Sequence, residues 1–147
     1  MRIDGARAAD RATELVLSYY AALNRADHAG VLAVLAEDVV HDVNQGEREV
    51  GSSAFATFLQ SMSASYREHF RDVVVMATQN GLHAAAEYVV EGVYLETAEG
   101  LPTANGQRYC LPGGAFFAIR DGRIARVSNH YNLSDWVRQV DRPRSGL

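Results

Sequence analysis

Apolar residues recur every three to four positions near the N-terminus, and this spacing predicts an amphipathic helix over residues 7–25. Asp27 is suited to cap a second, short helix. This short helix carries Val31, Val34 and Leu35. Ser52 or Ser53 can cap a third helix, which is again amphipathic. Its apolar stripe consists of Phe55, Phe58, Leu59, Met62 and Tyr66.

From residue 71 onward the period changes to two, which is typical of strands. Four strands are expected over residues 72–79, 82–97, 107–120 and 123–131. The dipeptides between them, Asn80-Gly81, Asn105-Gly106 and Asp121-Gly122, favour hairpin turns. Residues 39–43 predict an earlier strand, followed by a turn at residues 44–46 and a short strand that ends near Val50. Ser134 is expected to cap a last short helix that contains Trp136 and Val140.

Two of the expected strands are unusually long, and a long twisted sheet must curl. Gly92 and the pair Gly113-Gly114 lie inside strands, where glycine often marks a bulge or a bend. We therefore predict an α+β fold in which three to four helices pack on a cone-shaped, curved antiparallel sheet. The open end of such a cone can hold a small hydrophobic molecule.

The composition narrows the classes of function. A length of 147 residues fits one domain, with an ordered core over about residues 7–141 and a mobile tail after Asp141. The net charge of -4 and the lack of a basic stretch argue against a nucleic-acid partner. We expect no membrane span and no secretion signal, hence a cytoplasmic protein. No metal or other cofactor is expected, because the five histidines lack ligand spacing, and Cys110 is expected to be a buried, inert thiol.

The order of these elements resembles the nuclear-transport-factor-2-like superfamily, which has a cystatin-like fold. Residues 18–24 (SYYAALN) are similar to the first-helix motif of ketosteroid isomerases, and residues 35–42 (LAEDVVHD) to a junction in SnoaL-like polyketide cyclases. Residues 116–124 (FFAIRDGRI) resemble a hairpin of both. Residues 41–46 (HDVNQG) and 131–136 (YNLSDW) resemble ketosteroid isomerase-related proteins. The resemblance implies a single SnoaL-like domain over residues 1–147.

Asp42 is the first candidate for catalysis. The isomerases place their base aspartate on this strand, and a carboxylate that faces an apolar cavity has a raised pKa suited to that role. A shift of one residue would instead turn His41 inward. A third interpretation is that Asp42 caps the turn that begins at Asn44.

Tyr19 is the second candidate, because it aligns with the hydrogen-bond-donating tyrosine of the isomerases. It could stabilise negative charge on a substrate oxygen, or it could be an aromatic anchor of the core. The family's other catalytic acids are missing. Ala115 stands where the isomerases have a second acid, and Asn132 stands where polyketide cyclases commonly have an aspartate.

Strand alternation selects the remaining side chains of the predicted pocket. Ala86, Tyr88, Val90, Gly92 and Tyr94 share one face, and the charged Glu87 and Glu91 belong to the other. The expected substrate-binding residues are His41, Asn44, Tyr88, Tyr94, Asn129, Tyr131 and Trp136. These would give an apolar pocket a few polar groups, as is usual for a ligand site.

Two functions follow from this set. The first is general-base catalysis of the isomerase, cyclase or hydratase type on a small hydrophobic carbonyl or polyketide-like substrate; a lyase or hydrolase of the same fold is the variant of this hypothesis. The second is a non-catalytic binding protein for a small apolar metabolite. The resemblance also implies a homodimer formed through the convex face of the sheet, near Glu87 and Glu91.

Overall fold

The computed structural model describes residues 2–141, so the predicted tail after Asp141 lies outside the described residues. The helices are α1 (Arg2–Asn24), α2 (His28–Ala33), α3 (Ser52–Ser65) and α4 (Leu133–Val140). Asp27 caps α2 as predicted, because its Oδ1 accepts a hydrogen bond from the Gly30 amide at 2.9 Å. The cap of α4 is Asn132 rather than the expected Ser134, and α3 follows Gly51 without a side-chain cap.

Six strands form one sheet in the order β2-β1-β6-β5-β4-β3. Their bounds are β1 (Leu35–Asp42), β2 (Arg48–Val50), β3 (Tyr66–Ala77), β4 (His83–Tyr94), β5 (Arg108–Arg120) and β6 (Arg123–Tyr131). The pairs are antiparallel except for β1 with β6, which run parallel. The antiparallel meander and the fold class are thus as predicted, with one parallel pair that alternation alone does not reveal.

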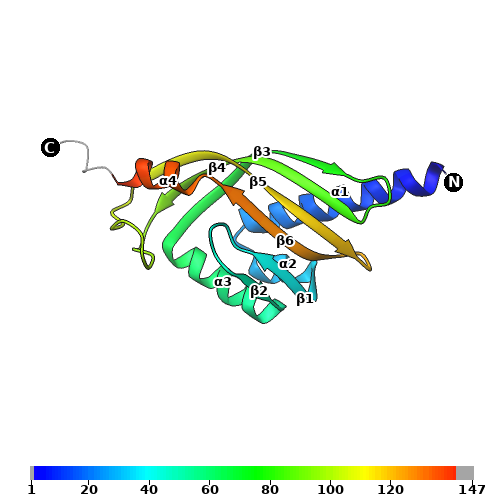
Figure 1. The fold of residues 1–147 in the computed structure, drawn as a ribbon, viewed down its shortest axis with the longest axis horizontal. Helices are drawn as coiled ribbons and strands as arrows, with labels where there is room; N and C mark the ends of the chain where they lie inside the picture. Colours follow the sequence, from blue (N-terminus) through cyan, green and yellow to red (C-terminus); the bar gives the residue numbers. More distant parts are fainter. Residues whose placement is uncertain (1, 142–147) are drawn as a thin grey trace.

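The sheet is curved, and its bulges lie elsewhere than expected. The pairing shifts between Arg71 and Val74, where Asp72 has a φ of 53°, and again between Ala118 and Ile119. Gly92 and Gly113 stay in regular register, so the prediction that they form bulges is wrong. Figure 1 shows α1, α2 and α3 on the same side of the curved sheet and α4 at its end.

The concave face carries the core. Along β4, residues Ala84, Ala86, Tyr88, Val90, Gly92 and Tyr94 are buried, while His83, Glu87 and Glu91 are exposed. This alternation confirms the predicted inward face of the meander. The helices α1 and α3 cover it, with Val16, Tyr19, Tyr20, Phe55 and Leu59 in the same buried cluster. Within residues 2–141, no helix combines the length and the apolar character needed to cross a bilayer.

One element boundary matters for the site. The apolar stripe of α3 predicts that Tyr66 is still helical, and the next strand was expected to begin at residue 72. Instead α3 ends at Ser65 and β3 begins at Tyr66, whose backbone is already extended (φ -135°, ψ 140°). The first part of β3, residues 66–71, therefore belongs to the sheet and places side chains on its concave face.

Candidate functional site

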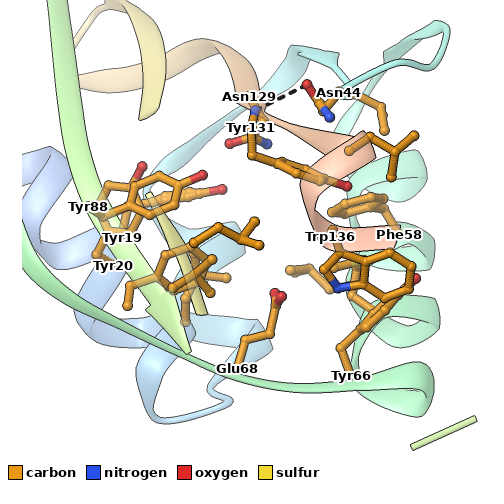
Figure 2. Close-up of a pocket in the computed structure, with 18 of the residues that line it drawn as sticks. Tyr19, Tyr20, Asn44, Phe58, Tyr66, Glu68, Tyr88, Asn129, Tyr131 and Trp136 are labelled. Atoms are coloured by element: carbon orange, nitrogen blue, oxygen red, sulfur yellow. Dashed lines mark hydrogen bonds between the residues drawn. The ribbon is translucent and has the colours of Figure 1, made fainter. Parts of the chain in front are cut away.

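A cavity of about 300 Å³ lies between the concave face of the sheet and the helices α1, α3 and α4. Figure 2 shows its polar and aromatic lining. The lining residues are Tyr19, Tyr20, Leu23, Val43, Asn44, Phe58, Leu59, Met62, Tyr66, Glu68, Phe70, Tyr88, Val90, Leu101, Leu111, Asn129, Tyr131, Leu133 and Trp136. The volume and the largely apolar lining fit a small organic molecule.

Three tyrosines form one wall of the cavity. Tyr19 and Tyr20 come from α1 and stack with ring centroids 5.1 Å apart, and Tyr88 from β4 lies 5.7 Å from Tyr20. Within residues 2–141 none of the three hydroxyls has a hydrogen-bond partner, although all three residues line the cavity. Burial raises the pKa of each phenol above its usual range. The three hydroxyls are therefore neutral donors available to a ligand oxygen.

Glu68, on β3, contributes a carboxyl group to the same cavity. Figure 2 shows this carboxyl directed into the space that the tyrosines border. Burial raises the pKa of Glu68 above its usual range. The Tyr109 hydroxyl donates to Glu68 Oε2 at 2.6 Å, which favours the charged form and partly opposes that rise in the pKa. Because its pKa is raised, the Glu68 carboxylate is a stronger base than an ordinary glutamate, which suits a general acid or base.

A glycine allows Tyr109 to reach Glu68. The register aligns Glu68 of β3, Gly92 of β4 and Tyr109 of β5 in one row across the sheet. A β-carbon at position 92 would lie 2.2 Å from Tyr109 Cζ, so the ring of Tyr109 occupies the space that any other side chain would take. The ring thus crosses β4 and brings its hydroxyl to the next strand but one.

A second close approach of a tyrosine ring to a glycine occurs at Gly113. Gly113 of β5 is paired with Tyr88 of β4 and with Tyr131 of β6. A β-carbon at position 113 would lie 2.7 Å from Tyr88 Cε1. Both glycines therefore leave room for an aromatic ring to pack against the backbone, and this packing holds Tyr109 and Tyr88 in place.

Asn44 and Asn129 supply the polar groups at the end of the cavity near β6. Asn44 Oδ1 accepts a hydrogen bond from the Tyr131 amide at 3.2 Å, which Figure 2 marks with a dashed line. Asn129 lies two residues before Tyr131 on the same inward face. Its Nδ2 is 3.2 Å from His41 Nε2. These amides can donate to or accept from an uncharged ligand group.

His41 does not line the cavity, so its predicted direct contact with a ligand is not supported. The residue is 1% exposed and lies between Phe55 and Phe58, with ring centroids 4.6 and 4.5 Å away. Burial lowers the pKa of His41, although the nearby Glu49 carboxylate opposes this. His41 faces inward, as expected if the strand is shifted by one residue. It contacts Asn129, which in turn lines the cavity.

The prediction that Asp42 faces the pocket is wrong. Val39 and His41 take the inward positions of β1, so alternation turns Asp42 outward. Its carboxylate binds Arg48 at 2.6 Å and accepts a hydrogen bond from Ser128 Oγ at 2.5 Å. The hydrogen bonds from Arg48 and Ser128 lower the pKa of Asp42 to about 2. A carboxylate so stabilised is a weak base, and it lies outside the cavity lining.

Tyr94 is a second correction. It is fully buried and does not line the cavity. Its hydroxyl donates to the Pro102 carbonyl at 2.7 Å and accepts from the Ala98 amide at 2.9 Å. The ring therefore fixes the loop between β4 and β5, and its hydroxyl proton is committed to that loop rather than to a ligand.

Cys110 is a third correction. The prediction of a buried thiol fails because its position on β5 belongs to the outward set, and the residue is exposed. Arg71 Nη2 approaches Cys110 Sγ at 3.7 Å on that outer face.

The structure thus brings together six of the predicted site residues, Tyr19, Asn44, Tyr88, Asn129, Tyr131 and Trp136, around one cavity. Their lining position is as expected, while their roles toward a ligand stay predictions. The residues that the sequence pattern missed are Glu68, Tyr109 and Tyr20. The sequence pattern does not reveal Glu68, because the alternation typical of a strand begins only after residue 71 while β3 already begins at Tyr66. Tyr20 is adjacent to Tyr19 in the motif, and both face the cavity.

The described part of the chain, residues 2–141, contains no group of three or more His, Cys, Asp or Glu side chains that could hold a metal ion. Ala115, which was expected to occupy the position of the isomerases' second acid, is buried in the core, and Asn132 caps α4. The titratable carboxyl of the cavity lining is that of Glu68.

This chain is similar to a known family and to several solved structures. Residues 16–127 match the family described as SnoaL-like domain. A proposed polyketide cyclase from Xanthomonas campestris pv. campestris is 61% identical, with a TM-score of 0.88 over 90% of this chain and 98% of that one. A proposed polyketide cyclase from Pseudomonas putida KT2440 is 59% identical, with a TM-score of 0.87 over 88% of this chain and 97% of that one.

A more distant structure, an NTF2-like protein from Burkholderia xenovorans LB400, is 18% identical. It superposes with a TM-score of 0.72 over 90% of this chain and 97% of that one, and therefore shares the fold. None of the curated proteins matches the chain.

Proposed function

The chain belongs to the SnoaL-like domain family, and from this premise we propose that it is an enzyme that moves a proton on a small, largely apolar carbonyl compound. The predicted superfamily and its small-molecule-binding, isomerase- or cyclase-type fold are confirmed. One observation carries the proposal. A carboxyl whose pKa is raised by burial shares an apolar cavity with three tyrosine hydroxyls that have no partner among the described residues.

The chemistry assigns one step to each group. The Glu68 carboxylate takes a proton from the carbon next to a substrate carbonyl, and the carbon–hydrogen electron pair moves toward the carbonyl oxygen. Hydroxyls of Tyr19, Tyr20 and Tyr88 donate hydrogen bonds to that oxygen as its negative charge develops. Protonated Glu68 then returns the proton to a different carbon, which is isomerisation. Alternatively the enolate carbon attacks a second carbonyl of the same molecule, and Glu68 protonates the new alkoxide, which is cyclisation.

Proton exchange on a model ketone tests this step without knowledge of the natural substrate. We expect the protein to accelerate the exchange of the α-hydrogens of 2-tetralone for deuterium in heavy water, followed by proton NMR. Glu68→Gln removes the base and should slow the exchange about 10²–10⁴-fold, the usual contribution of a positioned base. Asp42→Asn is the matched control, because this carboxylate lies outside the cavity, and it should change the rate less than about threefold. Equal rates for Glu68→Gln and the native protein would overturn the proposal.

A second candidate function is non-catalytic binding of a small apolar metabolite. The observation that favours it is that Glu68 is the only acid among the described residues of the cavity lining, while Ala115, which the resemblance places where the isomerases have a second acid, is buried in the core. Saturable binding of 2-tetralone without any acceleration of exchange would support this function over the first.

We also propose that two copies associate through the convex face of the sheet. Met76, Ala85 and Phe116 form one row on this face, and Met76 and Phe116 are 53% and 54% exposed. Apolar side chains gathered on an outer sheet face are typical of a protein interface. Light scattering should give the mass of a dimer for the native protein and of a monomer for Phe116→Glu.

A further inference from the structure

Three buried polar atoms lack a hydrogen-bond partner among the described residues: His41 Nδ1, Glu49 Oε1 and Asn44 Nδ2. The first two lie 3.6 Å apart, because the register of β1 and β2 places His41 directly opposite Glu49. The third lines the cavity. Buried polar groups are nearly always satisfied, so each of these atoms indicates a specific requirement of the site.

Glu49 determines which nitrogen of His41 carries the proton. Burial lowers the pKa of His41, so the ring is neutral at pH 7 and has a proton on one nitrogen. A proton on Nδ1 points toward the Glu49 carboxylate, whereas a bare Nδ1 would place its lone pair against a negative charge. Nδ1 is therefore the protonated atom, and Nε2 is an acceptor.

The orientation of Asn129 follows from that tautomer. Because His41 Nε2 accepts, the group that lies 3.2 Å from it must be the amide NH₂ of Asn129. The other end of the same amide, Oδ1, is then left for the cavity that Asn129 lines. His41 and Glu49 thus act as positioning residues for an acceptor in the pocket.

Asn44 provides the complementary donor. Its Oδ1 is occupied by the Tyr131 amide, so its Nδ2 is the remaining donor. No acceptor among residues 2–141 meets the distance of a hydrogen bond to it, while Asn44 lies close enough to the Tyr131 hydroxyl to lower the pKa of that phenol. Asn44 and Asn129 both flank Tyr131 in the cavity lining. A ligand group placed there meets one amide donor and one amide acceptor beside the Tyr131 side chain, and among residues 2–141 the carboxyl of the cavity lining is that of Glu68 on β3.

We infer that this end of the pocket recognises an uncharged group in which a carbonyl oxygen stands beside an N–H or O–H, such as a carboxamide, a lactam or an enolised dicarbonyl. The inference rests on the proposed function, since it names the substrate class of the same cavity. A simple ketone would satisfy Asn44 and leave the Asn129 oxygen unpaired, which is costly in a desolvated site.

A pair of probes of nearly equal shape tests the recognition. 2-Naphthamide has both a carbonyl and an N–H, and 2-acetylnaphthalene has the carbonyl alone. Calorimetric titration of the native protein should show at least tenfold tighter binding of the amide, equivalent to 1.4 kcal/mol. Equal affinities would overturn the inference and leave the proposed function standing. Failure of both probes to bind would contradict the pocket itself, and with it the proposed function.

The positioning role has its own readout, which is the ratio of the two affinities. His41→Phe keeps an aromatic ring between Phe55 and Phe58 but removes the acceptor that orients Asn129, so the preference for the amide should fall to about threefold or less. A purely structural defect would weaken both probes in parallel. Asp42→Asn, on the adjacent residue, is the control and should keep the native ratio. If His41→Phe keeps the native ratio of the two affinities, His41 does not orient Asn129. If that variant does not fold, the ratio measured for the native protein still tests the donor–acceptor pair.

Discussion

Asp42 and Glu68 are carboxyl groups on strands at opposite sides of the same sheet, and their surroundings give them opposite properties. Asp42 on β1 faces outward, binds Arg48 and Ser128, and has its pKa lowered to about 2. Glu68 on the edge strand β3 faces the cavity, has the Tyr109 phenol as its one hydrogen-bond partner among residues 2–141, and has its pKa raised by burial. The comparison teaches that the strand on which an acid lies does not determine its chemistry. The face and the number of donors do.

The environment of Glu68 should be the more fragile of the two, because it depends on a glycine. Gly92→Ala places a β-carbon 2.2 Å from Tyr109 Cζ, and either the ring or the strand must move. We expect a loss of about 3 kcal/mol in the free energy of unfolding, measured by chemical denaturation. The same substitution in a Tyr109→Ala background should cost much less, because the ring is gone. Equal losses in both backgrounds would contradict the crossing of the ring over Gly92.

Removal of the Glu68 charge should stabilise the protein. The folded-state pKa of Glu68 is raised, so its ionisation opposes folding, and stability should decline as the pH rises from about 4.5 through the folded pKa. Glu68→Gln should abolish this decline and raise the free energy of unfolding at pH 8 by about 0.5–2 kcal/mol, as is common when an active-site group is replaced. Glu87→Gln, at an exposed position of β4, is the control and should change the free energy of unfolding at pH 8 by less than about 0.5 kcal/mol.

Removal of the Asp42 charge should act in the opposite direction. Its folded pKa of about 2 lies below the ordinary value of 3.8, so its contribution is present above about pH 4 and is lost as the pH falls toward 2. Asp42→Asn should lower the free energy of unfolding at pH 7 by about 1 kcal/mol, since Arg48 is largely exposed and solvent screens the pair. Asp38→Asn, in the exposed pair with Arg120, should cost less. Stabilisation by Asp42→Asn would reverse the comparison.

Tyr109→Phe should have the smallest effect on stability and sharpen the comparison further. It removes the one hydrogen bond that favours ionised Glu68, and so raises the pKa of that carboxyl further. The rate of exchange of 2-tetralone, measured against pH, should rise at higher pH than in the native protein. The plateau should change less than about tenfold, the worth of one hydrogen bond. An unshifted profile would show that Tyr109 does not influence the base.

The fold was predictable because its signals are local and repeated. The hairpin dipeptides, the alternation along β4 and the cap at Asp27 each depend on near neighbours in the chain. The site was predictable only where it lies on such elements, as for Tyr88, Asn129 and Tyr131. Glu68 was hidden because α3 passes into β3 at Tyr66 without a glycine or proline to mark the change. The outward position of Asp42 depends on which β1 residues the sheet buries, and this is decided by distant strands.

The two close approaches of tyrosine to glycine have a consequence for how this pocket can change. At Gly92 the ring of Tyr109, and at Gly113 the ring of Tyr88, fills the volume of the missing side chain. Within each pair, therefore, a large side chain on one strand excludes a large side chain at the paired position of the other strand. Substitutions at these sites should therefore be tolerated in pairs rather than singly. Exchange of the glycine and the tyrosine between positions 92 and 109 would carry a phenol to the neighbouring strand, which offers a route to redirecting the base without rebuilding the sheet.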